Sequence, residues 1–290
     1  MNIKHHFKKI LVYIFWFFIA ILLAVCLRVF LFSPFSIPSQ SMSPAIEAGD
    51  HILINKLIPG ARIIKNYDFL DKGGRPDMWR LKGYRDVQRN DILVFNMPYN
   101  KKNGLHPDIN EHYIKRCVAL PGDTFYIDNG IYKVNGVSGK LGNYEAQQNL
   151  SQWKDQDMPQ GGFQCFPKRN KFYHWTMKNF GPLYVPRQND CLNIDFVNIA
   201  LYKIMIEYET GGKIRIVDEK VSLNDSIITH YTFDLNYYFM AGDNVLDSKD
   251  SRYWGVLPED HIVGKAFVIY KSNDLETKAF RWNRFLKAIE

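Results

Sequence analysis

The sequence predicts a mainly β protein in which a β-rich core, carrying an inserted second β-rich subdomain, follows one N-terminal transmembrane helix. Three observations support this fold class. The first 32 residues combine a long apolar run with a complete absence of acidic side chains. Beyond them, a turn ending in Asp is followed by an apolar run at three places, 49–56, 90–95 and 121–127. The chain around these turns has little helical periodicity, which is typical of strand-and-turn architectures.

The predicted transmembrane anchor covers residues 10–32. Its first part, Ile10–Leu27, carries no charge, and the apolar pattern resumes after Arg28. About 20 residues, rising about 1.5 Å each, are enough to cross the hydrocarbon core of a bilayer. The segment is preceded by three basic side chains, Lys4, Lys8 and Lys9. By the positive-inside rule, residues 1–9 are expected in the cytoplasm and the remaining chain outside. A cleaved signal peptide is the alternative, but its apolar region is usually only about 7–15 residues long.

Charge and cysteine content exclude several classes of protein. The net charge is +7, but the basic residues are dispersed and form no block or aromatic-spaced stripe, so no nucleic-acid partner is expected. Much of the excess lies near the two ends of the chain, which indicates a lipid bilayer as a partner. The four cysteines include no Cys-x-x-Cys pair, and we expect neither a metal site nor a cofactor. Cys165 and Cys191 are the first candidates for a disulfide.

A serine-rich stretch, 35–44, follows the anchor directly and reads Phe-Ser-Ile-Pro-Ser-Gln-Ser-Met-Ser-Pro. Apolar and small residues alternate with a period of two, which predicts an extended chain. Pro38 and Pro44 restrict it to an edge strand or a loop. The hydroxyls of Ser39 and Ser41 point to the same side of an extended chain, which suits one as a nucleophile and the other as an oxyanion donor. A plain linker between membrane and domain is the alternative.

A lysine interrupts the apolar strand predicted at 112–120. Lys115 shares one face of this strand with Tyr113 and Cys117, whereas Ile114 faces the other way. Burying a lysine charge is costly. A desolvated lysine with a pKa lowered to about 7–8 would serve as a general base at neutral pH. The alternative is a surface lysine on a half-exposed strand.

The segment 240–258 is dense in turn formers and short polar side chains, and it reads Met-Ala-Gly-Asp-Asn-Val-Leu-Asp-Ser-Lys-Asp-Ser-Arg-Tyr-Trp-Gly-Val-Leu-Pro. Such side chains bond their own backbone, so we expect an ordered loop. Asp250 and Arg252 are expected to pair and brace it. A purely structural turn is the alternative, and a closing strand is predicted at 262–270.

Two further regions carry no motif with identifiable chemistry. Residues 128–237 are rich in Asn, Gln, Gly, Lys and aromatic side chains, and we interpret them as the inserted β-rich subdomain. Residues 273–290 alternate apolar and basic side chains at helical spacing and are predicted as an amphipathic tail. Its apolar face would consist of Trp282, Phe285, Leu286 and Ile289. This tail is expected either on the membrane surface or as a cap on the core.

Together these motifs resemble the type I signal peptidase family. After the anchor, the chain has in family order Pro-Ser-x-Ser-Met-x-Pro, Gly-Asp-x-Ile-x-Ile-Asn-Lys, Asp-Ile-x-Val-Phe, Tyr-Ile-Lys-Arg and Pro-Gly-Asp. Gly-Asp-Asn and Asp-Ser-x-Asp-Ser-Arg-x-Trp-Gly-x-x-Pro follow. Each motif alone is weakly specific, whereas five in family order make a chance match improbable. The resemblance covers the anchor and residues 35–56, 89–127 and 240–270.

The resemblance implies a serine–lysine dyad protease that removes signal peptides from exported preproteins after small residues at positions −1 and −3. Ser41 matches the nucleophile, and Lys115, held neutral, matches the general base. The Ser41 N–H and the Ser39 hydroxyl would bind the oxyanion, and Ser248 would orient the lysine. Substrate pockets would be shaped by Phe35, Ile37, Met42, Tyr113 and Ile114. The loop would be braced by Asp243, Asn244, Asp250 and Arg252.

The same resemblance implies a single-pass protein of the cytoplasmic (inner) membrane, with its N-terminus in the cytoplasm and its catalytic domain on the outer, periplasmic side. Residues 33–127 and 238–272 would form the catalytic core. The family's usual Arg-Asp after Gly-Asp-Asn is replaced here by Val245-Leu246, and Asn90 stands where Gly is usual.

Two other functions are considered. The first is a catalytically weak or inactive paralogue that binds or processes a narrow set of export substrates. Intact Ser41, Lys115, Ser39 and Ser248 argue against inactivity. The second is a self-cleaving repressor protease with the same kind of dyad. It would need a DNA-binding helix-turn-helix where this chain has an apolar span.

Overall fold

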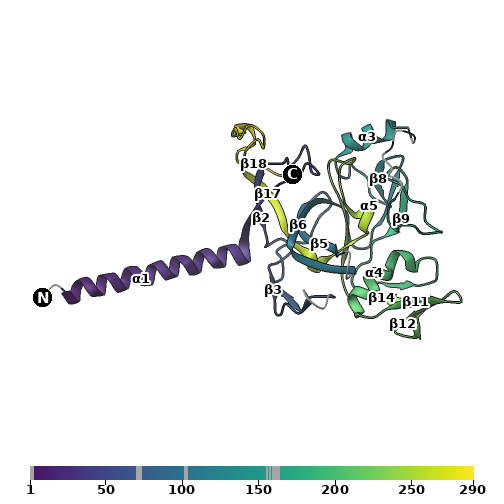
Figure 1. Ribbon diagram of the computed structural model, residues 1–290, viewed down its shortest axis with the longest axis horizontal. Helices are drawn as coiled ribbons and strands as arrows, with labels where there is room; N and C mark the ends of the chain where they lie inside the picture. The colour runs from purple at the N-terminus through teal and green to yellow at the C-terminus, as the bar shows by residue number, and fades with distance from the viewer. Residues whose placement is uncertain (1–2, 70–73, 101–103, 155, 157, 159–163) are drawn as a thin grey trace.

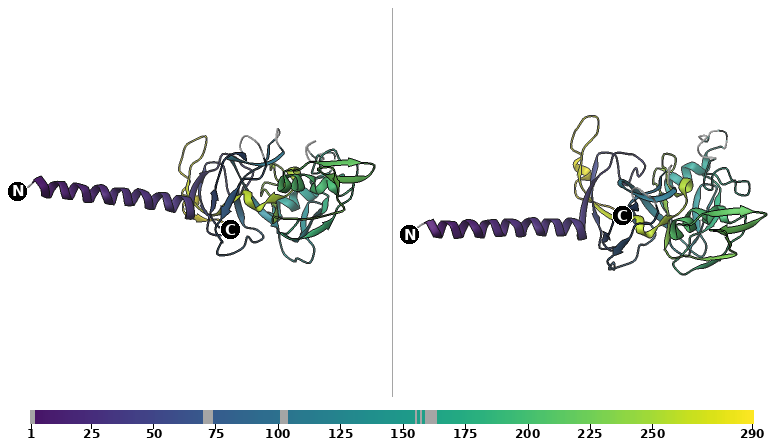
Figure 2. Two further views of the ribbon diagram at one scale, coloured as in Figure 1. Left: turned by 90° about the horizontal axis from the view of Figure 1, so that it is seen from below. Right: turned by 60° about the horizontal axis from the view of Figure 1, so that its bottom comes forward.

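The computed structural model describes residues 3–69, 74–100, 104–154, 156, 158 and 164–290. Helix α1 (Ile3–Cys26) and the short π-helical segment η1 (Leu27–Leu31) project together from the folded body as one rod (Figures 1 and 2). The span His6–Leu31 has a mean hydropathy of 3.0 in its apolar window, and none of that window is buried. The predicted transmembrane helix is therefore present as an apolar helix long enough to cross a membrane.

An eight-stranded sheet forms the centre of the body, in the order β1-β2-β17-β5-β6-β15-β16 with β18 paired to β17. All of its pairings are antiparallel. The strands are β1 (Phe32–Ser36), β2 (Asp50–Asn55), β5 (Ile92–Asn100), β6 (Gly104–Ala119), β15 (Tyr237–Ala241), β16 (Leu257–Pro258), β17 (Ile262–Ser272) and β18 (Lys287–Ala288). Strand β1 follows η1 without a loop and lies at the sheet edge. It includes only the first two residues of the serine-rich stretch 35–44, and the part between Pro38 and Pro44 is a loop, which is one of the two predicted outcomes.

The two faces of this sheet belong to different apolar clusters. Ile114 of β6 packs with Met42 and Ile46 in one cluster. Cys117 of the same strand packs with Phe95 in another. The predicted alternation of side chains along β6 is therefore confirmed, and it follows from the two-residue period of a strand.

A two-stranded ribbon, β3 (Arg62–Ile64) with β4 (Met78–Arg80), lies between β2 and β5 in the chain and is not part of the central sheet. Two arginines fasten it to the core. Arg62 donates to the backbone oxygen of Asp260 at 2.8 Å, and Arg80 donates to those of Glu259 and Ile262 at 2.9 Å each. Burial lowers the pKa of Arg62 to about 9, so both its charge and its donors remain available at neutral pH.

The described residues of the insert form strands, as predicted, and also two α-helices, and β7, which lies just before the predicted boundary, pairs with two of these strands. The elements are β7 (Thr124–Asp128), β8 (Ile131–Val134), α3 (Tyr144–Gln152), β9 (Phe180–Tyr184), β10 (Cys191–Asn193), α4 (Ile199–Thr210), β11 (Ile214–Val217), β12 (Lys220–Leu223), β13 (Ser226–Ile227) and β14 (His230–Thr232). Helix α4 was not predicted because its apolar pattern is blurred: its six buried residues lie on one half of the helix, but Glu209 falls within that half and Ile204 lies on the opposite one. Helix α3 begins at Asn143, whose side chain accepts from Ala146 N at 3.3 Å.

The insert shares one apolar cluster with the central sheet. Phe125 of β7 stacks on Phe239 of β15 with ring centroids 4.1 Å apart. Strand β7, on the core side of the predicted boundary, pairs with β8 and β9 of the insert. Val245 also belongs to this cluster, and Leu246 packs against it. The apolar pair Val245-Leu246 therefore joins the loop to the insert.

The C-terminal tail forms no amphipathic helix, so that prediction was wrong. Instead it contains a short 3₁₀ turn, η5 (Trp282–Arg284), followed by β18. Trp282 is 76% exposed whereas Ile289 is 8% exposed, so the residues predicted on one face are divided between solvent and core. Pairing of β18 with β17 and burial of Arg284 override the helical period of the sequence.

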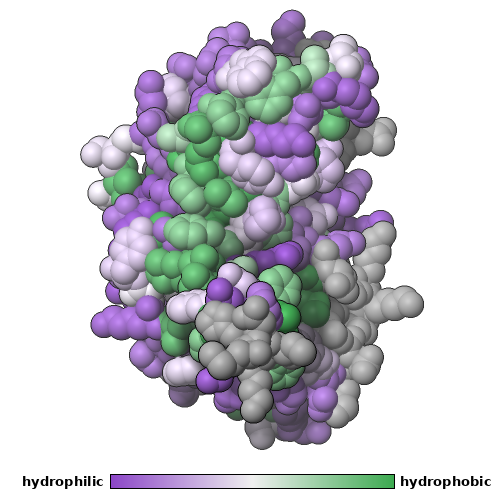
Figure 3. Space-filling model, turned by 90° about the vertical axis from the view of Figure 1, so that its left-hand side faces the viewer, coloured by the Kyte–Doolittle hydropathy of each residue, from purple (hydrophilic) through white to green (hydrophobic). Residues whose placement is uncertain are grey.

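Figure 3 views the face from which α1 projects and shows an apolar stripe across it.

The predicted disulfide is absent. Cys165 is buried and Cys191 is exposed, and both are thiols. Burial raises the pKa of the Cys165 thiol to about 12. A disulfide would need the two residues to approach within about 7 Å between their Cα atoms, a constraint that cysteine count alone cannot test.

Candidate active site

The chain leaves β1 and forms a loop over the central sheet before it returns as β2. Ile37 continues the ladder by donating its N–H to Asp50 O at 2.9 Å. Met42 and Ile46 are fully buried and hold the far side of the loop in the core. Ser41, directly before Met42, is consequently kept half-buried at the surface.

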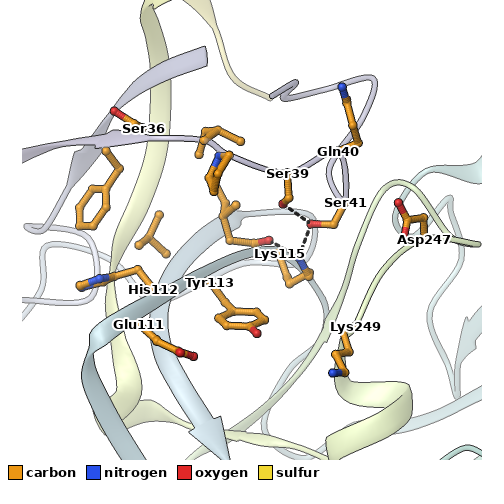
Figure 4. Close-up of a pocket in the computed structure, with 15 residues that line it drawn as sticks. Ser36, Ser39, Gln40, Ser41, Glu111, His112, Tyr113, Lys115, Asp247 and Lys249 are labelled. Atoms are coloured by element: carbon orange, nitrogen blue, oxygen red, sulfur yellow. Dashed lines mark hydrogen bonds between the residues drawn. The ribbon is translucent and has the colours of Figure 1, made fainter. Parts of the chain in front are cut away.

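Lys115 and two serines converge at this point (Figure 4). Lys115 Nζ lies 2.6 Å from Ser41 Oγ and 2.8 Å from the backbone oxygen of Ile114. Ser39 Oγ lies 3.4 Å from Ser41 Oγ on the other side. The sheet and its edge loop thereby bring together residues that are 74 positions apart in the sequence. A nucleophile and a base within hydrogen-bond reach are the minimum arrangement for covalent catalysis.

Burial lowers the pKa of Lys115 to about 8. The side chain is 3% exposed, and desolvation disfavours its charged form. The carboxylates of Asp250, Asp243 and Asp247 oppose this shift, while the Arg252 guanidinium adds to it. About a tenth of the lysine is therefore neutral at pH 7, compared with well under a thousandth for an ordinary lysine.

The loop before and within α5 (Ser251–Trp254) is braced by a buried ion pair. Arg252 donates through Nε and Nη2 to the two carboxylate oxygens of Asp250, at 2.8 and 2.7 Å. Both side chains are 0% exposed, and Gly242 N also donates to Asp250 at 2.9 Å. Burial alone would raise the pKa of Asp250, but the Arg252 charge and these donors hold it below its usual value. The predicted pair is present.

A second ion pair links the dyad to the same loop. Arg116 donates through Nε and Nη2 to Asp243 at 2.8 and 2.7 Å. The next residue, Asn244, donates its N–H to Ser41 O at 3.2 Å and its amide to Gln40 O at 3.4 Å. The loop thus holds the two peptide oxygens on either side of Ser41.

Ser248 does not make the hydrogen bond that was predicted. Its hydroxyl is buried and makes no close hydrogen bond among the described residues, and it lies near enough to Asp250 to help lower the pKa of that carboxyl. The second partner of Lys115 is instead Ile114 O. Ser248 lies against Gly242, where an added Cβ would collide with the Ser248 side chain and come within 2.6 Å of Ser41 O. A glycine is therefore required at position 242 for Ser41 and Ser248 to approach.

A cavity of about 510 Å³ opens beside the dyad. Four of the predicted pocket residues line it, Phe35, Ile37, Tyr113 and Ile114. The fifth, Met42, is fully buried below the loop and does not line the cavity. The lining residues that sequence reasoning missed are Ser36, Pro38, Gln40, Val94, Glu111, His112, Asp247 and Lys249. Glu111 and His112 precede Tyr113 on β6, so their position on that strand was the available signal, whereas nothing local marks Val94.

Besides Lys115, three charged side chains line the cavity, Glu111, Asp247 and Lys249. Asp247 extends from the loop toward Ser41, and Glu111 lies on β6 beside His112 (Figure 4). The His112 ring packs against Phe35 with centroids 4.9 Å apart. Within the described part of the chain, no group of three or more His, Cys, Asp or Glu side chains is arranged to hold a metal ion.

Comparison with known proteins decides the family. The profile described as "Signal peptidase, peptidase S26" matches residues 10–271. This match covers most of the chain and includes both the Ser41 loop and the Asp250 loop.

The chain belongs to the type I signal peptidase family.

Curated signal peptidase I proteins match along most of this length. That of Aquifex aeolicus is 29% identical over 88% of this chain and 82% of its own length. That of Pseudomonas aeruginosa is 30% identical over 88% of this chain and 70% of its own. That of Buchnera aphidicola from Acyrthosiphon pisum is 30% identical over 93% of this chain and 77% of its own. A solved signal peptidase I structure from Enterococcus faecalis covers 62% of this chain and 97% of its own, at 19% identity and a TM-score of 0.30, which is too low to add to the assignment.

Membership in the signal peptidase family makes this protein a serine peptidase that acts in signal-peptide cleavage. Its departure at Val245-Leu246 leaves the loop ordered, because Val245 is 1% exposed in the shared cluster and the Asp250–Arg252 pair is intact. Apolar packing against the insert therefore occupies the position of the family's charged pair in this signal peptidase.

Proposed function

We propose that this protein cleaves exported preproteins after small residues at positions −1 and −3, with Ser41 as nucleophile and Lys115 as general base. The observation that carries the proposal is the 2.6 Å contact between the buried Lys115 amine and Ser41 Oγ in a signal peptidase chain. A buried lysine without a carboxylate within hydrogen-bond distance is costly unless its neutral form is used.

The chemistry divides into two steps. Neutral Lys115 takes the proton of Ser41 Oγ as that oxygen attacks the scissile carbonyl carbon, and the ammonium then gives the proton to the leaving amine. The acyl-enzyme is hydrolysed by a water that the same lysine deprotonates. The Ser39 hydroxyl and the Ser41 N–H stabilise the oxyanion in both steps, and losing one such donor commonly costs about 10²–10³ in rate.

The substrate lies extended between the edge segment 35–39 and residues 113–115 of β6. Main-chain hydrogen bonds to both sides would add a strand, and alternate substrate side chains would enter the cavity. Phe35, Ile37 and Ile114 make its lining apolar, which favours small apolar side chains at the first and third positions.

Anchoring by α1 completes the proposal. The helix holds the catalytic domain in the cytoplasmic (inner) membrane, with residues 1–9 in the cytoplasm and the site on the outer, periplasmic side. The apolar stripe on the face from which α1 projects supports contact of that face with lipid (Figure 3). Partners are then the bilayer and the preproteins.

The specificity is tested with the detergent-purified protein and a preprotein that carries an Ala-x-Ala site. We expect cleavage at that site, and a loss of about 10²-fold in kcat/KM when the −1 Ala becomes Leu, because a shallow cavity cannot accept the larger side chain. A −3 Ala→Leu substrate is the parallel test, and an Ala→Leu change at the intervening −2 position is the control. Equal cleavage of all four substrates would contradict the pocket assignment.

The rate should rise with pH. A general base acts only when deprotonated, so with the pKa of Lys115 near 8 the value of kcat/KM should increase about tenfold per unit below pH 7 and level off above about pH 9. A pH–rate profile on the Ala-x-Ala substrate measures this. A rising limb centred near pH 10.5, the usual pKa of a lysine, would show that burial does not lower the pKa of Lys115.

A further inference from the structure

The C-terminal segment 281–290 contacts the underside of the loop that carries Ser41. Arg284 is 5% exposed and donates to the backbone oxygen of Ala45 at 3.1 Å. Its shortest contact, 2.6 Å, joins Nη2 to Asp50 Oδ2, and a further one reaches Glu47 at 3.2 Å. One guanidinium therefore holds a backbone oxygen and two carboxylates of this loop.

Arg281 makes the same kind of contact one turn earlier. It donates to Ala48 O at 2.7 Å and to the Glu47 carboxylate at 2.8 Å. Its Nε reaches Ser272 Oγ at 2.8 Å, and that hydroxyl donates to Asp50 at 2.7 Å. The two arginines and two carboxylates form one closed network, and Asp50 at its centre is 0% exposed.

The network lies a few residues from the nucleophile. Ile46 N donates to Met42 O at 3.0 Å, which joins the fastened backbone to the residue after Ser41. Ile289 of the tail belongs to the apolar cluster of Met42, Ile46 and Ile114. The tail thus packs beneath a neighbour of Ser41 and a neighbour of Lys115.

The last residue of the tail contacts the strand that carries the base. Arg116 Nη1 donates to the backbone oxygen of Glu290 at 2.8 Å, while its other nitrogens hold Asp243. Because Arg116 follows Lys115 on β6, the tail touches both of the segments that must meet at the dyad.

We propose that residues 281–290 are a positioning element that fixes the Ser41 loop against Lys115, with Arg284 as its central positioning residue. This inference rests on the dyad assigned above. A shift of about 1 Å between reacting groups can cost about 10²-fold in rate. Contacts that fix the position of the Ser41 loop therefore affect the rate of the chemical step. The cavity is lined by residues 35–41 of this segment, whereas Arg284 contacts residues 45–50, so we expect the affinity for substrate to stay unchanged.

A merely structural role predicts a different result. The tail would then contribute folding stability only, and its loss would reduce the fraction of folded enzyme without changing the properties of each active site. Arg80 provides the matched control, because it is likewise a buried guanidinium bound to backbone oxygens, those of Gly60, Glu259 and Ile262. Its contacts all lie outside the Ser41 loop.

The experiment compares Arg284→Ala with Arg80→Ala in the detergent-purified full chain, with rates normalised to folded protein. For Arg284→Ala we expect kcat to fall at least about tenfold with KM within about twofold. The rising limb of the pH–rate profile should move up by about one unit, because a displaced Ser41 loop admits water to Lys115. The other charged groups that act on Lys115 are kept in both variants, namely Asp250, Arg252, Asp243 and Asp247. Arg80→Ala should leave normalised kcat and the limb unchanged.

A second variant covers the case in which Arg284→Ala does not fold. Glu47→Gln keeps the shape of a half-exposed side chain and weakens its contacts to both arginines, so kcat should fall about two- to fivefold with an upward limb shift. Wild-type kcat and limb in Glu47→Gln, or an Arg284→Ala profile that matches Arg80→Ala, would overturn the inference. Ser41→Ala and Lys115→Ala are measured alongside. If these retain activity, the proposed dyad fails; if they abolish it while the tail variants behave like Arg80→Ala, only the inference fails.

Discussion

Replacement of Lys115 by Ala is expected to abolish preprotein cleavage, with a fall of about 10⁴-fold or more in kcat. The amine is 2.6 Å from Ser41 Oγ, and within the described residues no other basic side chain bonds to that oxygen. Ser41→Ala should cost as much. The double variant should be no worse than either single one, because the two residues act in one step. Cleavage of the Ala-x-Ala preprotein, followed by gel or mass spectrometry, measures all three.

The control for this series is Lys133→Ala. Lys133 pairs with Asp128 on the exposed surface, so this substitution removes a lysine and an ion pair at a distance from Ser41. The Lys133→Ala variant should cleave at the wild-type rate. Activity retained in Lys115→Ala would contradict the dyad, whereas no cleavage by the unmodified protein across several preproteins would favour the narrow-specificity paralogue.

Replacement of Arg252 by Met should lower the free energy of unfolding by about 3–5 kcal/mol, because it breaks a buried ion pair. Met keeps the apolar length of the side chain but leaves Asp250 charged in an environment where both partners are 0% exposed. Asp250 must then be protonated or hydrated, and the backbone bond from Gly242 loosens. Thermal unfolding in detergent, read by circular dichroism, should show a lower Tm.

The matched control is Arg215→Met. Arg215 pairs with Asp225 at 2.7 Å, but these side chains are 68% and 79% exposed. Exposed pairs contribute about 0–1 kcal/mol, so Tm should change little. Equal shifts in the two variants would show that burial does not determine the strength of the Asp250–Arg252 pair.

The stabilisation by the Asp250–Arg252 pair should depend on pH, because folding lowers the pKa of Asp250. The stabilisation is present above the pKa of Asp in the unfolded chain and is lost as pH falls through the pKa of Asp250 in the folded chain.

Much of the candidate site was predicted from local patterns. Ser39 and Ser41 were candidates because a two-residue spacing on an extended chain places both hydroxyls on one side, and Lys115 because a charge interrupts an apolar strand. These patterns alone left a linker and a surface lysine as alternatives, and the roles came from the family resemblance. In the structure the three side chains meet at the cavity.

Other predictions failed where distant residues decide. Apolar residues recur at helical spacing in the tail, but no helix forms there. Arg284 instead bonds to carboxylates next to the Ser41 loop, and β18 pairs with β17. Helix α4 was missed because Glu209 lies on its buried side, where it accepts from Tyr231 and Tyr237, and this polar residue interrupts the apolar period. Ser248 was assigned to Lys115 by resemblance, yet in the structure Ile114 O takes that contact.

The sequence by itself determined the apolar anchor, the central strands and the family, since each depends on the order of neighbouring residues, and it made Ser41 and Lys115 the candidates for the proposed dyad. Only the tertiary structure decided that the tail fastens the Ser41 loop, that Val245 packs against the insert and that Met42 lies below the cavity. These are contacts between segments up to about 240 positions apart. Their existence depends on which side chains the fold brings within about 3–4 Å, and no local pattern encodes that distance.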